Sequence, residues 1–168
     1  MKRNPEVFRT FRGYAMQEGG GSLTPSLEDY LEMLFRLAQK SGYTRLNDLA
    51  TVLNVQPASA SKMVQRLGQE GLLKYERYGT LELTDGGRKL GAVLLARHQL
   101  LEEFLRTIGV TGPVLEDTER IEHNISEETL TCMAAVVEFA RANPGWLQTY
   151  RDYLARRQAP GGSGDGSC

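Results

Sequence analysis

The sequence predicts a mainly α-helical protein in which an N-terminal winged helix-turn-helix domain precedes a second domain made of helices alone. Apolar residues recur at helical spacing through most of the chain. Between residues 72 and 83 they alternate instead, on both sides of a Gly-containing turn, as in a β-hairpin. The order helix, short helix, turn, helix, hairpin is that of a winged helix-turn-helix. An unrelated α+β domain is the alternative that this order leaves open.

The first domain is predicted in four segments. A helix is expected over residues 26–40, with Ser26 as its N-cap, Asp29 completing a capping box, and Gly42 ending it. A short helix over 46–53 and a tight link lead to a third helix. That helix begins at Pro57, a residue that the first helical turn tolerates, and runs to about Gln69. The hairpin strands follow, with their turn at residues 77–79.

The second domain is predicted as four helices. They cover about residues 85–108, about 114–124, a segment capped by Ser126, and a last helix that Pro144 opens. The helix after Ser126 is apolar on two faces, with Leu130, Met133, Ala134 and Val137 on one and Cys132, Val136 and Phe139 on the other. Two apolar faces need two partners, and a second subunit supplies one of them. A homodimer is therefore expected. The residues of the last helix predicted to pack inward are Trp146, Leu147, Tyr150, Tyr153 and Leu154.

Composition sets the expected domain limits and compartment. Glycines collect at 19–21 and 161–166, which predicts a flexible extension over 1–22, domains over 23–83 and 84–157, and a flexible tail over 158–168. No apolar stretch approaches the ~20 residues of a membrane span, and residues 1–17 lack the apolar region of a secretory signal. The two cysteines, Cys132 and Cys168, form neither a disulfide framework nor a Cys-x-x-Cys site. We expect a cytoplasmic protein without a membrane partner.

Charge is unevenly distributed along the chain. The net charge is −1, but residues 111–168 carry five Lys and Arg against nine Asp and Glu. Residues 1–82 carry eleven against nine. The distribution permits DNA binding by the first half of the chain.

The third helix carries the residues expected to contact DNA. With Ala60, Val64 and Leu67 directed to the core, its other face combines small residues, which permit close approach to a groove, with donors to phosphates. A merely solvated helix face is the alternative. The hairpin favours DNA, because its turn could reach an adjacent backbone or minor groove. The expected contacts are Gln56, Pro57, Ala58, Ser59, Ser61, Lys62, Gln65, Arg66 and Arg77.

Six side chains of metal-binding type stand in three groups: Asp29 with Glu32, His98, and Glu119 with Glu122 and His123. The last three are spaced i, i+3, i+4 and so share a helix face. Each group alone has an ordinary alternative, either a solvated acidic face or a buried histidine. The chain has two histidines, however, and both fall where carboxylates could converge on them.

These segments together resemble the diphtheria toxin repressor family, most closely its branch of manganese transport regulators. The matching motifs lie in order at residues 27–32, 59–65, 83–87, 97–98 and 121–123, and the resemblance covers about residues 24–142. It implies that the helical domain is a dimerisation and metal-binding domain. The ligands it implies are Asp29, Glu32, His98, Glu119, Glu122 and His123. In the iron-responsive branch, the positions matching Asp29 and Glu119 look like Met and Cys.

The resemblance also implies a function. It predicts a manganese-responsive repressor of manganese uptake genes that binds a palindromic DNA operator as a homodimer and has no small-molecule substrate. Hard oxygen ligands with imidazole suit Mn²⁺, and four carboxylates balance two divalent ions, so two Mn²⁺ per subunit are expected. The ligands come from both domains, and metal is therefore expected to link them and fix the spacing of the recognition helices.

Three alternatives stay open at this stage. An iron-responsive regulator or a metal-independent winged-helix regulator would share the same fold. A dinuclear metallohydrolase is less favoured, since the sequence shows no separate nucleophile or substrate loop. The chain is therefore not expected to be an enzyme.

Overall fold

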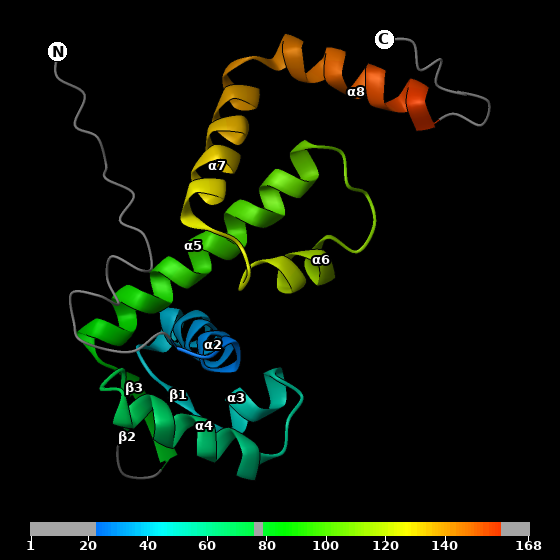
Figure 1. The fold of residues 1–168 in the computed structure, drawn as a ribbon. Helices are drawn as coiled ribbons and strands as arrows, with labels where there is room; N and C mark the ends of the chain where they lie inside the picture. The colour runs from blue at the N-terminus through cyan, green and yellow to red at the C-terminus, as the bar shows by residue number, and fades with distance from the viewer. Residues whose placement is uncertain (1–22, 76–78, 159–168) are drawn as a thin grey trace, which may run out of the picture. The chain divides into compact units, whose positions relative to one another are not determined.

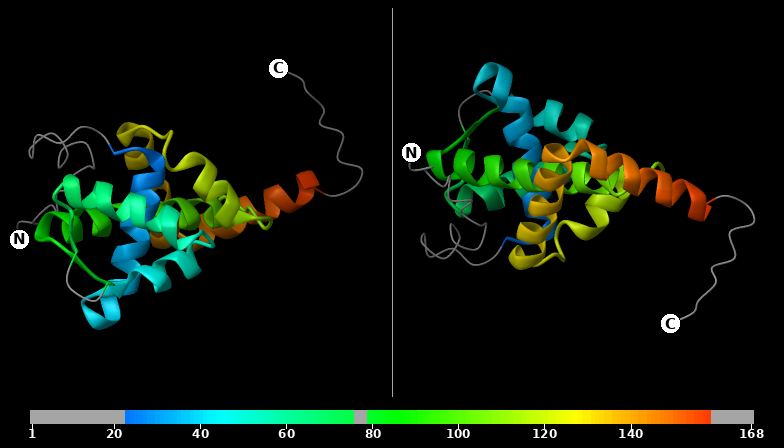
Figure 2. Two further views of the ribbon diagram at one scale, coloured as in Figure 1. Left: turned by 90° about the horizontal axis from the view of Figure 1, so that it is seen from below. Right: turned by 90° about the horizontal axis from the view of Figure 1, so that it is seen from above.

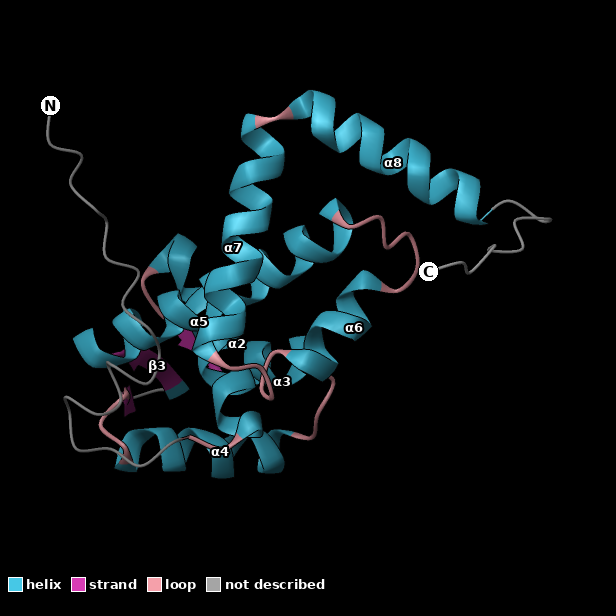
Figure 3. Ribbon diagram, turned by 45° about the horizontal axis from the view of Figure 1, so that its top comes forward, coloured by secondary structure: helices cyan, strands magenta, loops and turns pink. Residues whose placement is uncertain are grey.

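The computed structural model describes residues 23–75 and 79–158. The predicted extension over 1–22, residues 159–168 of the predicted tail, and Arg77 lie outside the described residues. The fold is mainly helical with one small antiparallel sheet, as predicted (Figures 1 and 3). The chain divides into two compact units within helix α5 (Asp85–Thr107), between Ala96 and Arg97. The expected domain boundary after residue 83 stays a prediction, because α5 contributes to both units.

The first unit is a winged helix-turn-helix. Its elements before α5 are α2 (Pro25–Ser41), β1 (Thr44–Arg45), α3 (Leu46–Val52), α4 (Pro57–Gln69), β2 (Leu73–Tyr75) and β3 (Thr80–Leu83). The helices α2, α3 and α4 lie close together in both views of Figure 2. The strands are antiparallel in the order β1-β3-β2, with Thr44 opposite Leu81 and Leu73 opposite Leu83. The predicted hairpin thus forms, and a third strand that the sequence did not predict joins it.

The core of this unit takes a leucine or valine from nearly every element. The residues exposed by 1% or less are Leu31 and Leu34 on α2, Leu49 on α3, Ala60, Val64 and Leu67 on α4, Leu81 on β3 and Leu94 on α5. Burying one such leucine or valine side chain contributes about 1.5–3 kcal/mol. The face of α4 predicted to point to the core is therefore confirmed, and α2 contributes a buried face of its own.

The start of α2 differs from the prediction. The helix begins at Pro25, so Thr24 is the N-cap and Ser26 lies inside the first turn. The Thr24 carbonyl accepts hydrogen bonds from the backbone N–H groups of Leu27 and Glu28, at 2.8 and 3.0 Å. A proline at the first helical position has its φ already set for the helix, and this outweighs the capping preference of Ser26. At the other end the prediction is confirmed: Gly42 has φ +79° and its N–H donates to the Ala38 carbonyl.

The first turns of α5 pack closely on the rest of the first unit. Thr84 Oγ donates to the Gly71 carbonyl at 2.8 Å and accepts from the Gly87 N–H at 3.0 Å, so it caps the helix. A Cβ at Gly87 would lie 2.0 Å from the Leu72 carbonyl oxygen. One turn later, a Cβ at Gly91 would lie 2.6 Å from Cβ of Phe35 on α2. Glycine at both positions allows the close approach.

The second unit is all-helical, as predicted. It contains the rest of α5 with α6 (Val114–Ile121), α7 (Glu127–Ala142) and α8 (Pro144–Gln158). Its buried apolar side chains are Leu101, Val114, Leu130, Val137 and Ala140. Ser126 is the N-cap of α7, and its side chain accepts from the Thr129 N–H, which confirms the predicted cap. Within the described residues, no helix is long and apolar enough to cross a membrane.

Two predictions for this unit are wrong. Helix α6 ends at Ile121 rather than near residue 124. On α8, Trp146 and Tyr153 are 41% and 52% exposed instead of facing inward. The Trp146 ring packs edge-on against Phe139 and stacks on Tyr150, with centroids 5.3 and 5.7 Å away. These aromatic rings thus contact one another at the α7–α8 junction, and the single chain leaves part of that surface exposed.

Candidate metal centre and nucleic-acid interface

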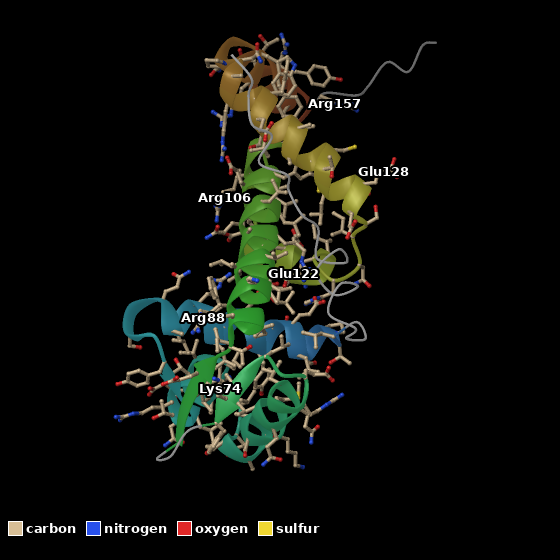
Figure 4. The ribbon with its side chains drawn as sticks, turned by 90° about the vertical axis from the view of Figure 1, so that its left-hand side faces the viewer. Lys74, Arg88, Arg106, Glu122, Glu128 and Arg157 are labelled. Carbon is tan, nitrogen blue, oxygen red and sulfur yellow. The ribbon has the colours of Figure 1, made fainter. Side chains whose placement is uncertain are left out.

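A cluster of two histidines and two glutamates forms in the second unit, where the end of α6 meets α5. The carboxylate of Glu122 contacts both histidines: Oε2 lies 3.0 Å from Nδ1 of His98, and Oε1 lies 3.5 Å from Nε2 of His123. Oε1 of Glu119 lies 3.9 Å from the same His98 nitrogen. Figure 4 shows Glu122 beside α5. The structure therefore brings together four of the six predicted ligands.

The end of α6 explains how these side chains come to share one side. Glu122 lies just beyond the helix but keeps helical angles, φ −61° and ψ −30°, and its N–H donates to the Thr118 carbonyl. Glu119 and Glu122 therefore retain their i, i+3 relation although the helix is shorter than predicted. A hydrogen bond from the Asn124 N–H to the Ile121 carbonyl closes the turn that carries His123.

The donor set of this cluster fits a divalent cation. Carboxylate oxygens and imidazole nitrogens are hard or borderline ligands, and no thiolate is among them. The 3.0 Å between His98 and Glu122 matches two adjacent ligands of a six-coordinate ion, which lie about 3.0 Å apart when the metal–ligand bonds are ~2.1 Å. Glu122 and His98 are buried, at 2% and 3% exposure. A carboxylate buried to that extent is stabilised when a cation or donated hydrogen bonds balance its charge.

The other two predicted ligands belong to the first unit. Asp29 and Glu32 stand three residues apart on α2, and so share one face of that helix. Arg36 donates from Nε to Oε1 of Glu32 at 2.9 Å, and its second nitrogen lies 2.5 Å from the same oxygen. Tyr30 lies between Asp29 and Glu32 in the sequence, and burial raises the pKa of its hydroxyl, so this phenol stays neutral at physiological pH.

One residue of the second cluster was not assigned a role from the sequence. Arg97, which precedes His98 on α5, is buried, and its Nη2 lies 3.5 Å from Nδ1 of His123. Its position beside His98 in the chain is the only sequence signal that points to it. The helical spacing of α5 indicates neither burial nor a contact with a residue 26 positions later.

The predicted DNA-binding face of α4 is accessible. Of the expected contacts, Ser61 is half-buried and Gln56, Pro57, Ala58, Ser59, Lys62, Gln65 and Arg66 are exposed. Ala60, Val64 and Leu67 are buried on the opposite side. The tight link before α4 places Asn54 at φ +51°, and the Val55 N–H donates to the Ala50 carbonyl at 3.0 Å. No acidic side chain lies on α4 itself, which suits contact with phosphates.

Comparison with known proteins matches both units. Residues 22–81 match the family described as "Iron dependent repressor, N-terminal DNA binding domain". Residues 84–146 match "Iron dependent repressor, metal binding and dimerisation domain".

Curated relatives cover most of the chain. This chain is 41% identical over 136 residues to the HTH-type transcriptional regulator MntR of Geobacillus kaustophilus. The aligned region covers 80% of this chain and 96% of that protein. It is 45% identical over 122 residues to the regulator of the same name from Lysinibacillus sphaericus, with 72% and 88% covered.

Solved structures agree at the level of the fold. The manganese regulator SloR matches with a TM-score of 0.60 and 26% identity, over 70% of this chain and 55% of that chain. IdeR of T. acidophilum matches with a TM-score of 0.57 and 30% identity, over 67% and 53%. The chain thus spans about half the length of these two solved chains. Because two family models match most of the chain and the curated relatives agree with them, the chain belongs to the iron-dependent repressor family, that of the diphtheria toxin repressor, and is a DNA-binding, dimer-forming transcription regulator.

Proposed function

We propose that the chain is a manganese-responsive repressor of manganese uptake genes, acting in the cytoplasm as a homodimer on a palindromic operator. The observation that carries this proposal is Glu122, a buried carboxylate that contacts His98 and His123, the two histidines of the chain. Relatives at 41–45% identity bear the name MntR, and the solved SloR is described as a manganese regulator. Membership of a family of DNA-binding repressors argues against a dinuclear metallohydrolase.

The proposed ligand set extends beyond the cluster in the second unit. We assign two Mn²⁺ per subunit to Asp29, Glu32, His98, Glu119, Glu122 and His123. Four carboxylates carry the charge that balances two divalent ions. The carboxylates at Asp29 and Glu119 support manganese over iron, because a thioether and a thiolate at these positions would favour softer ions. Iron remains the second candidate, since both matching family models are described as iron dependent.

The proposed mechanism follows from charge. Two carboxylates ~4 Å apart repel by about 4 kcal/mol at an effective dielectric of 20, and bound divalent ions would supply the opposite charge. Asp29 and Glu32 lie on the first helix of the DNA-binding unit, whereas Glu119, Glu122 and His123 belong to the dimerisation unit. When all of them hold the same ions, the two units become coupled. This coupling selects the spacing at which two α4 helices enter successive major grooves.

Isothermal calorimetry of the full chain with Mn²⁺ tests the proposal. We expect about two ions per subunit for the wild type, and loss of at least one of them in Glu122→Gln, which keeps the shape of the side chain but removes its charge. Glu138→Gln, at an exposed position on α7, is the matched control and should bind as the wild type does. Absence of Mn²⁺ binding by the wild-type protein would leave a metal-independent regulator. Tighter operator binding with Fe²⁺ than with Mn²⁺, under anaerobic conditions, would favour the iron alternative.

A further inference from the structure

We propose that Arg97 is an internal competitor of the metal ion: its hydrogen bond to His123 and the use of His123 as a metal ligand exclude each other. This inference rests on the proposed function, because it assigns a role to a residue beside the metal cluster. It identifies Arg97 as the residue that sets how much metal the regulator needs before it responds.

The direction of the hydrogen bond between Arg97 and His123 is fixed by chemistry. A guanidinium has only N–H donors and stays protonated in proteins. At 3.5 Å from Nη2 of Arg97, Nδ1 of His123 must therefore be the acceptor. A neutral imidazole that accepts at Nδ1 carries its proton on Nε2. That nitrogen lies 3.5 Å from Oε1 of Glu122, where an N–H can donate to the carboxylate. Both ring nitrogens are thus accounted for by protein partners.

Neither nitrogen of His123 can bind a metal ion while this arrangement persists. If the ion uses Nδ1, it needs the same lone pair that accepts from Arg97. If the ion uses Nε2, the proton must move to Nδ1, and two N–H groups would then face each other. In both cases the hydrogen bond from Arg97 has to break. Ligation by His123 therefore moves the Arg97 side chain, whichever nitrogen serves as the ligand.

The charge of Arg97 acts in the same direction as its hydrogen bond. The side chain is 8% exposed, so solvent screens its charge weakly. It lies beside His98 in the chain and in contact with His123, so it is a fixed positive charge at the edge of the cluster. The positive charge of Arg97 at this place lowers the attraction of the four ligands for a metal ion. Removing the charge and the donor together should increase metal affinity.

Calorimetry with Mn²⁺ on three variants of the full chain tests this inference. Arg97→Met keeps a long side chain but removes the charge and the donors, whereas Arg97→Lys keeps the charge. Arg106→Met is the control on the same helix: its side chain is 64% exposed, it pairs with Glu102 at 3.6 Å, and it lies further along α5 (Figure 4). We expect Arg97→Met to bind Mn²⁺ about tenfold more tightly than the wild type. Arg97→Lys should fall between the two, and Arg106→Met should match the wild type.

A spectroscopic measurement on the unmutated protein guards against a folding defect in the variants. In protein labelled with ¹⁵N-histidine and ¹⁵N-arginine and kept in chelator, the His123 resonances should show an unprotonated Nδ1 and a protonated Nε2. These resonances are identified by their loss in His123→Gln. Addition of Cd²⁺, a diamagnetic probe, should change the His123 resonances and the Arg97 guanidinium resonance together.

Two results would overturn the role of Arg97. One is a folded Arg97→Met protein that binds Mn²⁺ no more tightly than the wild type. The other is a His123 ring protonated at Nδ1 in chelator. If instead the wild type does not bind Mn²⁺ at all, the proposed function fails, and the histidine spectra in chelator still decide whether the contact exists.

Discussion

Replacing Gly87 by alanine should destabilise the first unit, although alanine is the better helix former. Gly87 lies in the first turn of α5, where a Cβ would stand 2.0 Å from the Leu72 carbonyl oxygen and 2.9 Å from its carbon. That oxygen cannot move away without loss, because it accepts a hydrogen bond from the Thr84 N–H at 3.1 Å. The new methyl group therefore has to displace either α5 or the segment that leads into β2.

The magnitude follows from three opposing contributions. Alanine stabilises a helix by about 0.5–1 kcal/mol relative to glycine. Overpacking against backbone costs about 1–3 kcal/mol, and loss of the hydrogen bond from Thr84 to Leu72 costs about 1 kcal/mol more. The variant Gly87→Ala should therefore be less stable than the wild type by about 1–3.5 kcal/mol.

Urea denaturation of the full chain, followed by circular dichroism, measures this difference. Gly145→Ala is the matched control, because Gly145 also lies in the first turn of a helix, α8, and has nothing within 4 Å of an added Cβ. It should be neutral or stabilising by up to about 1 kcal/mol. If Gly87→Ala proved as stable as the wild type, the close approach of α5 to Leu72 would be wrong.

Three further predictions concern function. Replacing Lys62 or Arg66 by alanine should weaken binding to all DNA sequences and reduce the slope of log K against log salt concentration by about 0.9 for each phosphate that the variant no longer neutralises. A bulky residue at Ser61 should instead change the preferred sequence. Fluorescence anisotropy at several salt concentrations measures both effects, and an unchanged slope would point to another DNA-binding surface. The variant Asp29→Met should lose its preference for Mn²⁺ and bind the operator as well or better with Fe²⁺ or Co²⁺ in anaerobic titrations. If it kept the wild-type order of response to these metals, Asp29 would not be a ligand that sets metal selectivity. The wild type should sediment as a dimer at micromolar concentration in chelator, and Phe139→Glu should shift it towards monomer; a stable wild-type monomer would contradict the second apolar face of α7.

Local patterns predicted the helices well where one face is committed to a core. The stripe of α4 illustrates this, since Ala60, Val64 and Leu67 are buried and the residues between them are accessible. The same reasoning is wrong for Trp146 on α8, because periodicity shows that a face is apolar but not what covers it. Strand β1 escaped prediction because two residues are too few to show alternation.

The candidate metal cluster was predictable in composition but not in its contacts. The spacing of Glu119 and Glu122 indicated a shared face, and the rarity of histidine in the chain made His98 a candidate that the resemblance then supported. That Glu122 contacts both histidines depends on how α6 packs on α5, which spacing within one helix does not encode. Arg97 was missed for the same reason, since its partner His123 is on another element.

The position of β3 in the sheet constrains the order in which the first unit can fold. This strand, Thr80–Leu83, is the last of the three in the chain but lies between the other two. The pairing of Thr44 with Leu81 therefore closes a loop that contains α3 and α4 entirely. During synthesis these helices leave the ribosome before their sheet can exist, and the closure entropy of that loop is overcome only when β3 arrives. A fragment that ends before Thr80 would lose both strand pairings at once, so α4, the helix we propose contacts DNA, depends for its support on residues made after it.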